Sequence, residues 1–146
     1  ENFMRAATAM KSYDLNEAKV MAEEEARTLL ATRIQTAVEN ATKSYNKNVS
    51  NNNSLSEGRI RERINKQFCD ETVGGLHIVA NKIYALPNGA IEYNVCYEMK
   101  KNKEDVIKNV LEEISRDKEL ELRFDQKKFE EEMADEMKAY KEKRNN

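Results

Sequence analysis

The sequence is poor in several residue types. Its 146 residues include no tryptophan, one proline and two cysteines. Without tryptophan, a carbohydrate-binding platform built on that side chain is excluded. Two cysteines are too few to indicate a disulfide framework. No stretch approaches the roughly 20 consecutive apolar residues that a membrane-spanning helix needs. The formal net charge of −2 gives the protein no global field that would attract nucleic acid or an anionic membrane.

Charged residues are abundant instead. They make up 36% of the chain, against 39% apolar residues, so a small core under a large solvated helix surface is expected. The length predicts a single domain over residues 1–146. Within it we expect a core over residues 1–100 and a charged helical tail over residues 101–146, where charges of both signs are interspersed. Because the chain starts at Glu1, we expect a processed or truncated product that lacks its signal or lipid-attachment segment.

Two elements are predicted near the start of the chain. Small apolar residues alternate loosely over residues 2–14, which indicates a strand. Asp14 can cap a following helix, and Glu17 completes a capping-box pattern three residues later. In this helix, apolar side chains recur every four residues as one stripe, in which the small alanines predict close packing on a sheet. The stripe consists of Ala18, Ala22, Ala26, Leu30, Ile34 and Val38.

The clearest local signal is a hairpin in the middle of the chain. Pro87 fixes φ, and Asn88 and Gly89 accept the positive φ of a tight turn. Residues 91–99 alternate cleanly between apolar and polar, as in a half-buried strand. The preceding strand, residues 76–86, carries apolar residues on both faces, which predicts a strand that is covered on both sides.

The remaining segments predict a loop and three helices, and the order of all elements indicates the fold class. Polar residues 46–58 predict a loop, and the next segment predicts a short helix that ends before Gly74. Asn102 can cap another helix, and a last helix is expected over about residues 126–143. This order predicts an α+β, two-layer domain, in which the long helix packs on a three-stranded antiparallel sheet with a C-terminal helical extension.

The sequence contains no catalytic signature. His77 could act as a general base, but no nucleophile stands near it at a useful spacing and no serine lies in a GxSxG elbow. We therefore interpret His77 as a solvated or hydrogen-bonded sheet residue. The many carboxylates sit beside lysines on predicted helices, as on a solvated surface, and not as a pair that faces across a cleft. The chain is predicted to be non-enzymatic and to bind no cofactor.

The two cysteines leave one pairing open. Cys69, His77 and Cys96 stand singly, without the short paired spacing of structural zinc ligands, so we predict no metal site. A disulfide between Cys69 and Cys96 is more plausible than zinc. It requires Cα atoms within about 7 Å, which the sequence does not determine.

A basic segment after the polar loop could contact phosphates. Acidic residues interleave with it and no glycine-rich phosphate loop is present, so a solvated helix face is favoured and no nucleic-acid partner is predicted. Its cations are Arg59, Arg61, Arg63 and Lys66.

Two groups of side chains are candidate binding surfaces. In the last helix, apolar residues spaced for one face suit either packing back on the sheet or docking of a partner in a helix-in-groove contact. These residues are Phe129, Met133, Met137 and Tyr140. Alternatively, a small-ligand pocket between helix and sheet, roofed by the polar loop, would be lined by Tyr84, Tyr93 and Tyr97.

Read together, several segments resemble a known family. The segment "AATAMKSYDLNEAKVMAEEEARTLLATRIQTAVEN" carries an AxxxAxxxAR spacing at Ala18, Ala22, Ala26 and Arg27. With "GGLHIVANKIYALPNGAIEYNVCYEM" and the charged "ELRFDQKKFEEEMADEM", it is similar to the LPP-type twenty-kilodalton surface lipoprotein family. The chain also resembles the N-terminal domain of flagellar T-ring proteins.

The resemblance implies a location and a role. It implies a helix-on-sheet domain in the cell envelope of a Gram-negative bacterium, either periplasmic or held at the outer membrane by an N-terminal lipid anchor outside these residues. It further implies a non-enzymatic role in binding or assembly with other envelope proteins. An exposed sheet edge would favour a homodimer. The alternative expectation is a periplasmic carrier of a small ligand.

Overall fold

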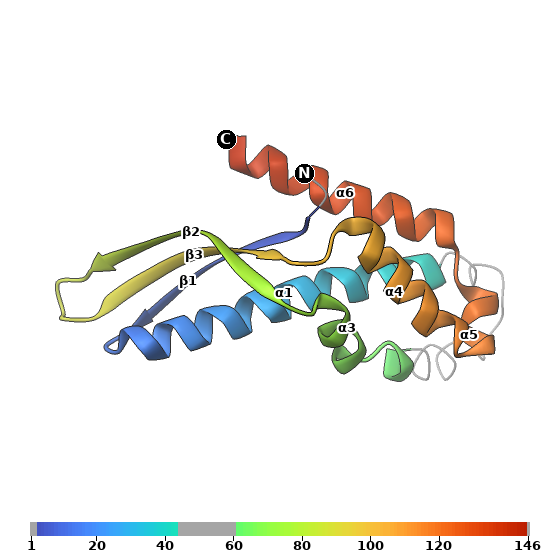
Figure 1. Ribbon diagram of the computed structural model, residues 1–146, viewed down its shortest axis with the longest axis horizontal. Coiled ribbons are helices and arrows are strands. Elements are labelled where there is room, and N and C mark those ends of the chain that lie inside the picture. Colours follow the sequence, from blue (N-terminus) through green and yellow to red (C-terminus); the bar gives the residue numbers. More distant parts are fainter. Residues whose placement is uncertain (1–2, 44–60, 146) are drawn as a thin grey trace.

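The computed structural model describes the backbone of residues 3–43 and 61–145. Side chains are described within these ranges except at Lys43, at Lys66 and beyond residue 135. The predicted polar loop at residues 46–58 therefore lies outside the described residues. Figure 1 shows a long helix against one face of a three-stranded sheet, with further helices at one end.

The α+β prediction is confirmed. The strands are antiparallel in the order β1-β3-β2, and they are β1 (Arg5–Ser12), β2 (Leu76–Ala85) and β3 (Ile91–Met99). The main helices of the described ranges are α1 (Leu15–Lys43), α3 (Lys66–Val73), α4 (Lys103–Ser115), α5 (Lys118–Arg123) and α6 (Gln126–Asn145). Residues 61–63 add one helical turn ahead of α3.

The start of α1 is capped as predicted, with one difference. The Asp14 carboxylate accepts the Asn16 backbone N–H at 2.9 Å. The predicted partner of the Asp14 N–H was Glu17, but the Ser12 hydroxyl accepts this N–H at 3.1 Å. That hydroxyl in turn donates to Glu17 at 3.3 Å, so the capping box closes through Ser12.

The alanine stripe places α1 against the sheet. Ala18, Ala22 and Ala26 are fully buried against the face of β1 and β3 that we call the inner face. Their small side chains let the helix approach closely enough for the Thr8 hydroxyl of β1 to donate to the Ala22 carbonyl at 3.4 Å. The second half of the stripe, from Leu30 onward, extends the same core toward the C-terminal helices.

The hairpin turn forms at the predicted residues. Leu86 accepts the Gly89 N–H at 3.1 Å and donates its own N–H to Ala90 at 2.8 Å. Gly89 has φ 85°, a left-handed conformation that favours glycine. Asn88 does not need a positive φ; its side chain instead accepts the Ala90 N–H at 3.1 Å.

The prediction that the first hairpin strand is covered on both sides is wrong. β2 is an edge strand, and its side chains are exposed over almost its whole length. A β-bulge lies between Ile78 and Ala80, so Val79 is an extra residue relative to β3. The bulge reverses the alternation of side chains along the strand. Apolar residues at both odd and even positions therefore reflect a bulge in this strand.

The C-terminal helices close the other end of the core. Asn102 caps α4 as predicted, accepting the Asp105 N–H at 2.8 Å. In α6, Phe129 and Met133 are fully buried in the core cluster, and α6 packs mainly on α1. These two side chains are therefore not available for docking a partner, and they pack on α1 where the sheet had been expected. The side chains of Met137 and Tyr140 lie outside the described residues.

Candidate functional site

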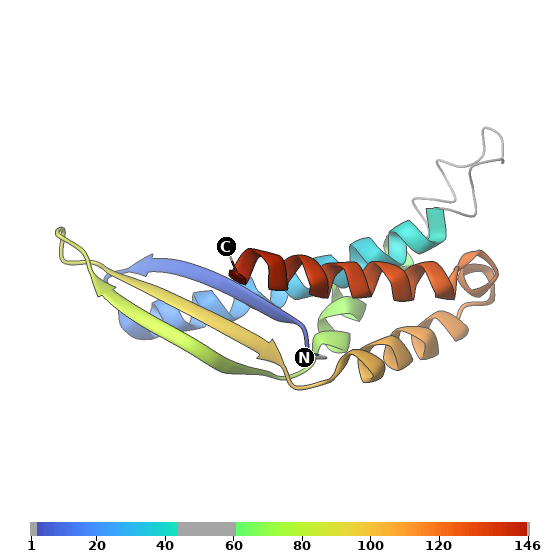
Figure 2. The same cartoon turned by 90° about the horizontal axis from the view of Figure 1, so that it is seen from above.

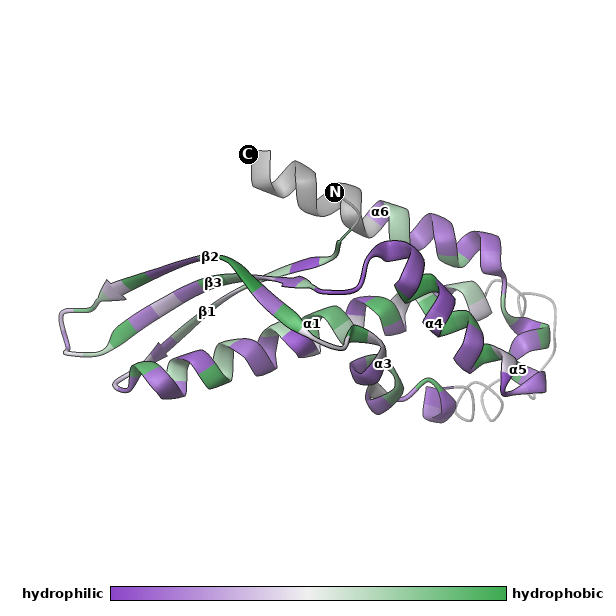
Figure 3. Ribbon diagram, viewed as in Figure 1, coloured by the Kyte–Doolittle hydropathy of each residue, from purple (hydrophilic) through white to green (hydrophobic). Residues whose placement is uncertain are grey.

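The free edge of β2 is the main candidate for an interaction surface. β2 pairs with β3 on one side, and in Figure 2 no described element lies along its other side. α1 packs on β1 and β3, so β2 extends beyond the helix. Its inner-face residues Ile78 and Ile83 are 48% and 49% exposed. In Figure 3 hydrophobic residues reach this margin of the sheet.

A groove runs beside this edge, between α1 and the inner face of β2. It has a volume of about 440 Å³. Its apolar lining comes from Val20 of α1 and from Leu76 and Ile78 of β2, and Lys19 and Glu23 place opposite charges along the α1 side. Asn81 and two tyrosines of β3 complete the lining. The groove and the free edge together offer apolar contact and backbone hydrogen-bonding groups side by side.

The three tyrosines predicted to line a pocket do not lie together. Tyr93 and Tyr97 line the groove on the inner face. Tyr84 pairs with Glu92 in the sheet register and so lies on the opposite, outer face, where Lys82 stands over its ring at 5.4 Å. The bulge explains this difference, because it shifts which residues of β2 share a face with β3. Tyr84 is therefore not a lining residue.

The two tyrosines of the groove differ in their surroundings. The Tyr93 hydroxyl is buried and hydrogen-bonds to none of the described residues. Burial raises the pKa of Tyr97 to about 12, with smaller contributions from Tyr93 and from the negative charge of Glu23. The Tyr97 hydroxyl is therefore protonated at neutral pH and can donate a hydrogen bond into the groove.

The outer face of the sheet carries the single histidine in a charged row. Glu98 of β3 accepts from Arg5 of β1 at 2.6 Å and lies 3.0 Å from His77 Nε2 of β2. Partial burial raises the pKa of Glu98, but the hydrogen bond and charge of Arg5, followed by those of His77, lower it more, so the net pKa is below its ordinary value. The row joins three strands electrostatically.

The cysteines do not form the disulfide that the sequence left open. Cys69 is buried in the core on α3, whereas Cys96 lies half-buried on the outer face of β3. Burial, with the nearby carboxylates of Asp70 and Glu39, raises the pKa of Cys69 to about 12. In the described ranges, no group of three or more potential ligands is placed to hold a metal ion.

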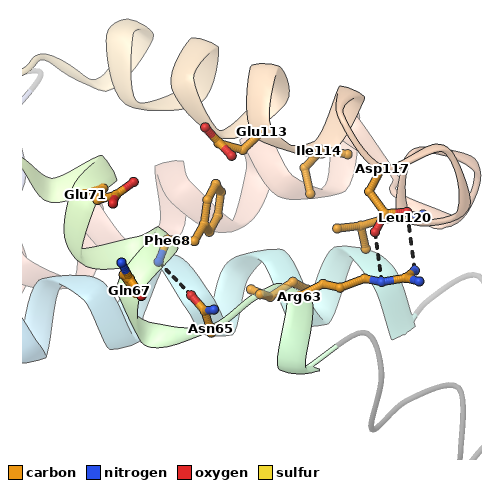
Figure 4. A pocket seen from close by; sticks show the side chains of 10 residues that line it. Arg63, Asn65, Gln67, Phe68, Glu71, Glu113, Ile114, Asp117 and Leu120 are labelled. Carbon is orange, nitrogen blue, oxygen red and sulfur yellow. Dashed lines mark hydrogen bonds and ion pairs between the residues drawn. The ribbon is translucent and has the colours of Figure 1, made fainter.

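A second hollow lies between α3, α4 and α5. It has a volume of about 350 Å³, and Figure 4 shows the Phe68 ring and the Glu71 and Glu113 carboxylates around it. Arg63 closes one end by pairing with Asp117 at 3.0 Å and with Glu119 at 3.0 Å. Arg63 is thus neutralised within the protein. Arg59 and the side chain of Lys66, two other cations of the basic segment, lie outside the described part of the chain.

Comparisons with known proteins give no match. Neither a protein-family model, nor a curated protein, nor a solved structure is similar to this chain. In the part of the chain that the structure describes, none of the helices is both long and apolar enough to cross a membrane.

Sequence reasoning missed the two isoleucines of the β2 edge as surface residues. Ile78 and Ile83 are five positions apart, so regular alternation places them on opposite faces and suggests double-sided burial. The available signal was the contrast with residues 91–99, whose alternation is clean. When one strand of a hairpin alternates regularly between apolar and polar residues and its partner strand does not, a bulge in the partner strand is indicated.

Proposed function

We propose that this chain is a non-enzymatic, protein-binding domain of a bacterial cell-envelope lipoprotein, and that it assembles with other envelope proteins through the free edge of β2. The location rests on the resemblance of its segments to the surface lipoprotein family. The exposure of β2, with Ile78 and Ile83 half exposed beside unpaired backbone groups, is the observation that carries the binding role.

The physical argument is the addition of a strand to the sheet. An edge strand leaves alternate N–H and C=O groups without a strand partner, and an added strand can pair with them. Each such hydrogen bond contributes about 0.5–1.5 kcal/mol net. The side chains of the added strand on its inner face would lie beside Ile78 and the groove, where apolar contact supplies further affinity.

The other edge of the sheet is a poorer binding surface. Met4 directs its carbonyl to Met99 of β3, so the carbonyl of Arg5 points to the free side of β1. There the Arg33 guanidinium of α1 donates to it at 2.6 Å. The inner face of β1 is covered by α1, and Ala7 and Ala9 on its outer face offer little apolar surface. These features favour β2 as the docking edge.

Photo-crosslinking in the native cells tests the binding role. A photoreactive phenylalanine analogue replaces Ile83 in the full-length protein, and the same analogue replaces Leu122 of α5, which is 75% exposed, as the control. We expect adducts from position 83 that are lost when Ile78→Lys is added, because a charge on the inner face opposes strand addition. Equal adduct yields from positions 83 and 122 would contradict the proposal.

The lipoprotein part of the proposal has a separate test. We expect the natural full-length protein, isolated from its own cells, to have an intact mass that exceeds its polypeptide mass by the acyl groups of a lipidated N-terminal cysteine. It should then fractionate with membranes and be released by detergent. An unmodified protein in the cytosolic fraction would exclude the envelope location and leave the binding role of β2 to be judged on its own test.

A second candidate is a small-ligand carrier, and the Tyr93 hydroxyl favours it. This buried donor has no partner among the described residues and belongs to a residue that lines the groove. A ligand with an apolar body and one hydrogen-bond acceptor would suit such a lining. Native mass spectrometry of the protein purified from its own cells should then show a bound mass that Ile78→Lys removes. A single unliganded mass would exclude the carrier function.

A further inference from the structure

We propose that the strand which pairs with β2 is the β2 strand of a second copy of this chain, antiparallel and related by a two-fold axis at Asn81. This inference rests on the proposed binding role of the β2 edge and specifies its occupant. It follows from three properties of β2: which residues share a face, which backbone groups point to the free edge, and how the apolar residues are spaced.

The faces of β2 follow from its register with β3. Ile78 pairs with Tyr97, Asn81 with Val95 and Ile83 with Tyr93. The three β3 residues are buried on the inner face, and directly paired residues share a face, so their β2 partners also lie on the inner face. By the same rule His77, Ala80, Lys82 and Tyr84 lie on the outer face.

The hydrogen bonds at the two ends of β2 show which of its residues direct their backbone N–H and C=O groups to the free edge. The Gly75 carbonyl accepts from the Lys100 N–H at 3.0 Å, and the Leu86 N–H donates to Ala90 at 2.8 Å, so Gly75 and Leu86 both face β3. In an antiparallel pair, successive residues direct their backbone groups alternately to one side and the other. The residues that face the free edge are therefore Leu76, Ile78, Asn81, Ile83 and Ala85.

Every inner-face residue of β2 is thus also an edge-facing residue. In an antiparallel pair, opposite residues share a face, and hydrogen-bonded residues must both face their partner. When Asn81 lies opposite the partner's Asn81, Ile78 lies opposite the partner's Ile83, and Leu76 lies opposite the partner's Ala85. Both conditions hold for each pair. They hold because Val79 is bulged, which makes the two isoleucines symmetric about Asn81.

Neighbouring registers are less favourable. If the two-fold axis lay at Lys82, the Lys82 side chains of the two copies would be directly opposite each other. Like charges in that position destabilise a strand pair. Moving the axis to Ala80 leaves the last residues of each β2 beyond the end of the other strand. With the axis at Asn81, Lys82 lies opposite the partner's Ala80, and His77 lies opposite the partner's Tyr84. The strands then overlap over their full length.

The groove gives a further reason for a second copy. A two-fold axis in a continuous antiparallel sheet is perpendicular to it, so both α1 helices lie on the same face of a six-stranded sheet. The partner's Ile83 then stands beside Ile78, which lines the groove, and each half-exposed isoleucine gains an apolar neighbour. One copy contributes Ile78 and its partner contributes Ile83, so the contact needs no protein other than this chain.

Oxidative cross-linking of the purified chain tests this register. Cys96→Ala removes the more accessible native thiol, and Asn81→Cys is introduced at the proposed axis. Hydrogen-bonded partners have Cα atoms about 5.5 Å apart, within the range of a disulfide. Ala85→Cys is the matched control, since it shares the face and edge of Asn81 but would lie opposite the partner's Leu76. Circular dichroism confirms that each variant is folded.

We expect wild-type protein to have twice the 17.0 kDa mass of one chain in sedimentation equilibrium. Asn81→Cys should form a covalent dimer faster than Ala85→Cys by a factor on the order of 10 or more, since the axis holds the two thiols together. Ile83→Lys should yield a monomer, whereas Leu122→Lys should stay dimeric.

Two results would overturn the inference. One is a monomer at all protein concentrations, and the other is a dimer in which positions 81 and 85 cross-link at equal rates. If the purified chain is monomeric while position 83 still cross-links to another protein in cells, the second copy is excluded and the proposed binding role stands. If position 83 also gives no specific adducts, both fail.

Discussion

Glu98 of β3 accepts a hydrogen bond from Arg5 of β1 at 2.6 Å, across the outer face of the sheet. The carboxylate is partly buried, which raises its pKa, but Arg5 and then His77 lower the pKa by a larger amount. A carboxyl whose pKa is lower in the folded than in the unfolded state stabilises the fold above its unfolded pKa. That contribution is lost as the pH falls through the folded pKa.

Glu98→Gln should therefore destabilise the protein in a pH-dependent way. At pH 7 we expect the free energy of unfolding to fall by on the order of 1 kcal/mol, because a charged hydrogen bond is replaced by a neutral one. The difference from wild type should shrink below about pH 4, where the unfolded carboxyl is protonated. Urea unfolding of both proteins between pH 7 and pH 2 measures this difference in the free energy of unfolding.

The matched control for this prediction lies on the same strand. Glu92→Gln makes the same substitution on the outer face of β3, where Glu92 forms no ion pair with a described residue. It should change the free energy of unfolding by less than about 0.5 kcal/mol at any pH. A Glu98→Gln variant whose deficit stayed constant down to pH 2 would show that the carboxylate charge is not the cause.

The alanine stripe of α1 predicts a strong effect of side-chain size. Ala22→Leu should destabilise the protein by about 1–3 kcal/mol, because Ala22 is fully buried and a larger side chain would force the helix from the sheet. It should also lengthen the 3.4 Å contact between the Thr8 hydroxyl and the Ala22 carbonyl. Glu24→Leu, exposed on the same helix, is the control. Equal thermal unfolding midpoints for both variants would contradict close helix–sheet packing.

The apolar stripe of α6 is predicted to stabilise the fold. Phe129→Ala should lower the free energy of unfolding by about 3–5 kcal/mol, because the ring is fully buried and packs 5.4 Å from the Phe124 ring. Leu122→Ala, at an exposed position on α5, should change it by less than about 0.5 kcal/mol. Denaturant unfolding compares the two. A near-neutral Phe129→Ala would contradict the packing of α6 on the core.

Much of the fold could be predicted because its determinants are local. Asp14 and Asn102 cap their helices as expected, and Gly89 occupies the turn that its conformational freedom favours. Capping and turn formation depend on neighbouring residues, so one sequence suffices to recognise them. The apolar stripe of α1 likewise follows from helical periodicity, and its alanines are buried against the sheet.

The candidate site could not be predicted to the same extent because it depends on strand order and register. Which strand lies at the edge follows from the placement of β3 between β1 and β2, which no single segment encodes. One bulged residue, Val79, moves Tyr84 away from the groove and brings Ile83 to the inner face. Long-range contacts such as the Arg33 hydrogen bond to Arg5 have no local signal either.

The buried thiol of Cys69 gives a last prediction. Its pKa of about 12 leaves a thiolate fraction on the order of 1 in 10,000 at pH 8, and the thiolate is the reactive form. We expect iodoacetamide to modify native protein once, at half-buried Cys96, and urea-unfolded protein twice. Intact-mass measurement counts the adducts.

Two variants separate this prediction from a disulfide. Native Cys96→Ala should gain no adduct, whereas native Cys69→Ala should gain one, because burial protects only the thiol on α3. Wild-type protein that takes no adduct even in urea until a reductant is added would indicate a bond between the cysteines. It would then require a rearrangement, since one thiol lies in the core and the other on the opposite face of the sheet.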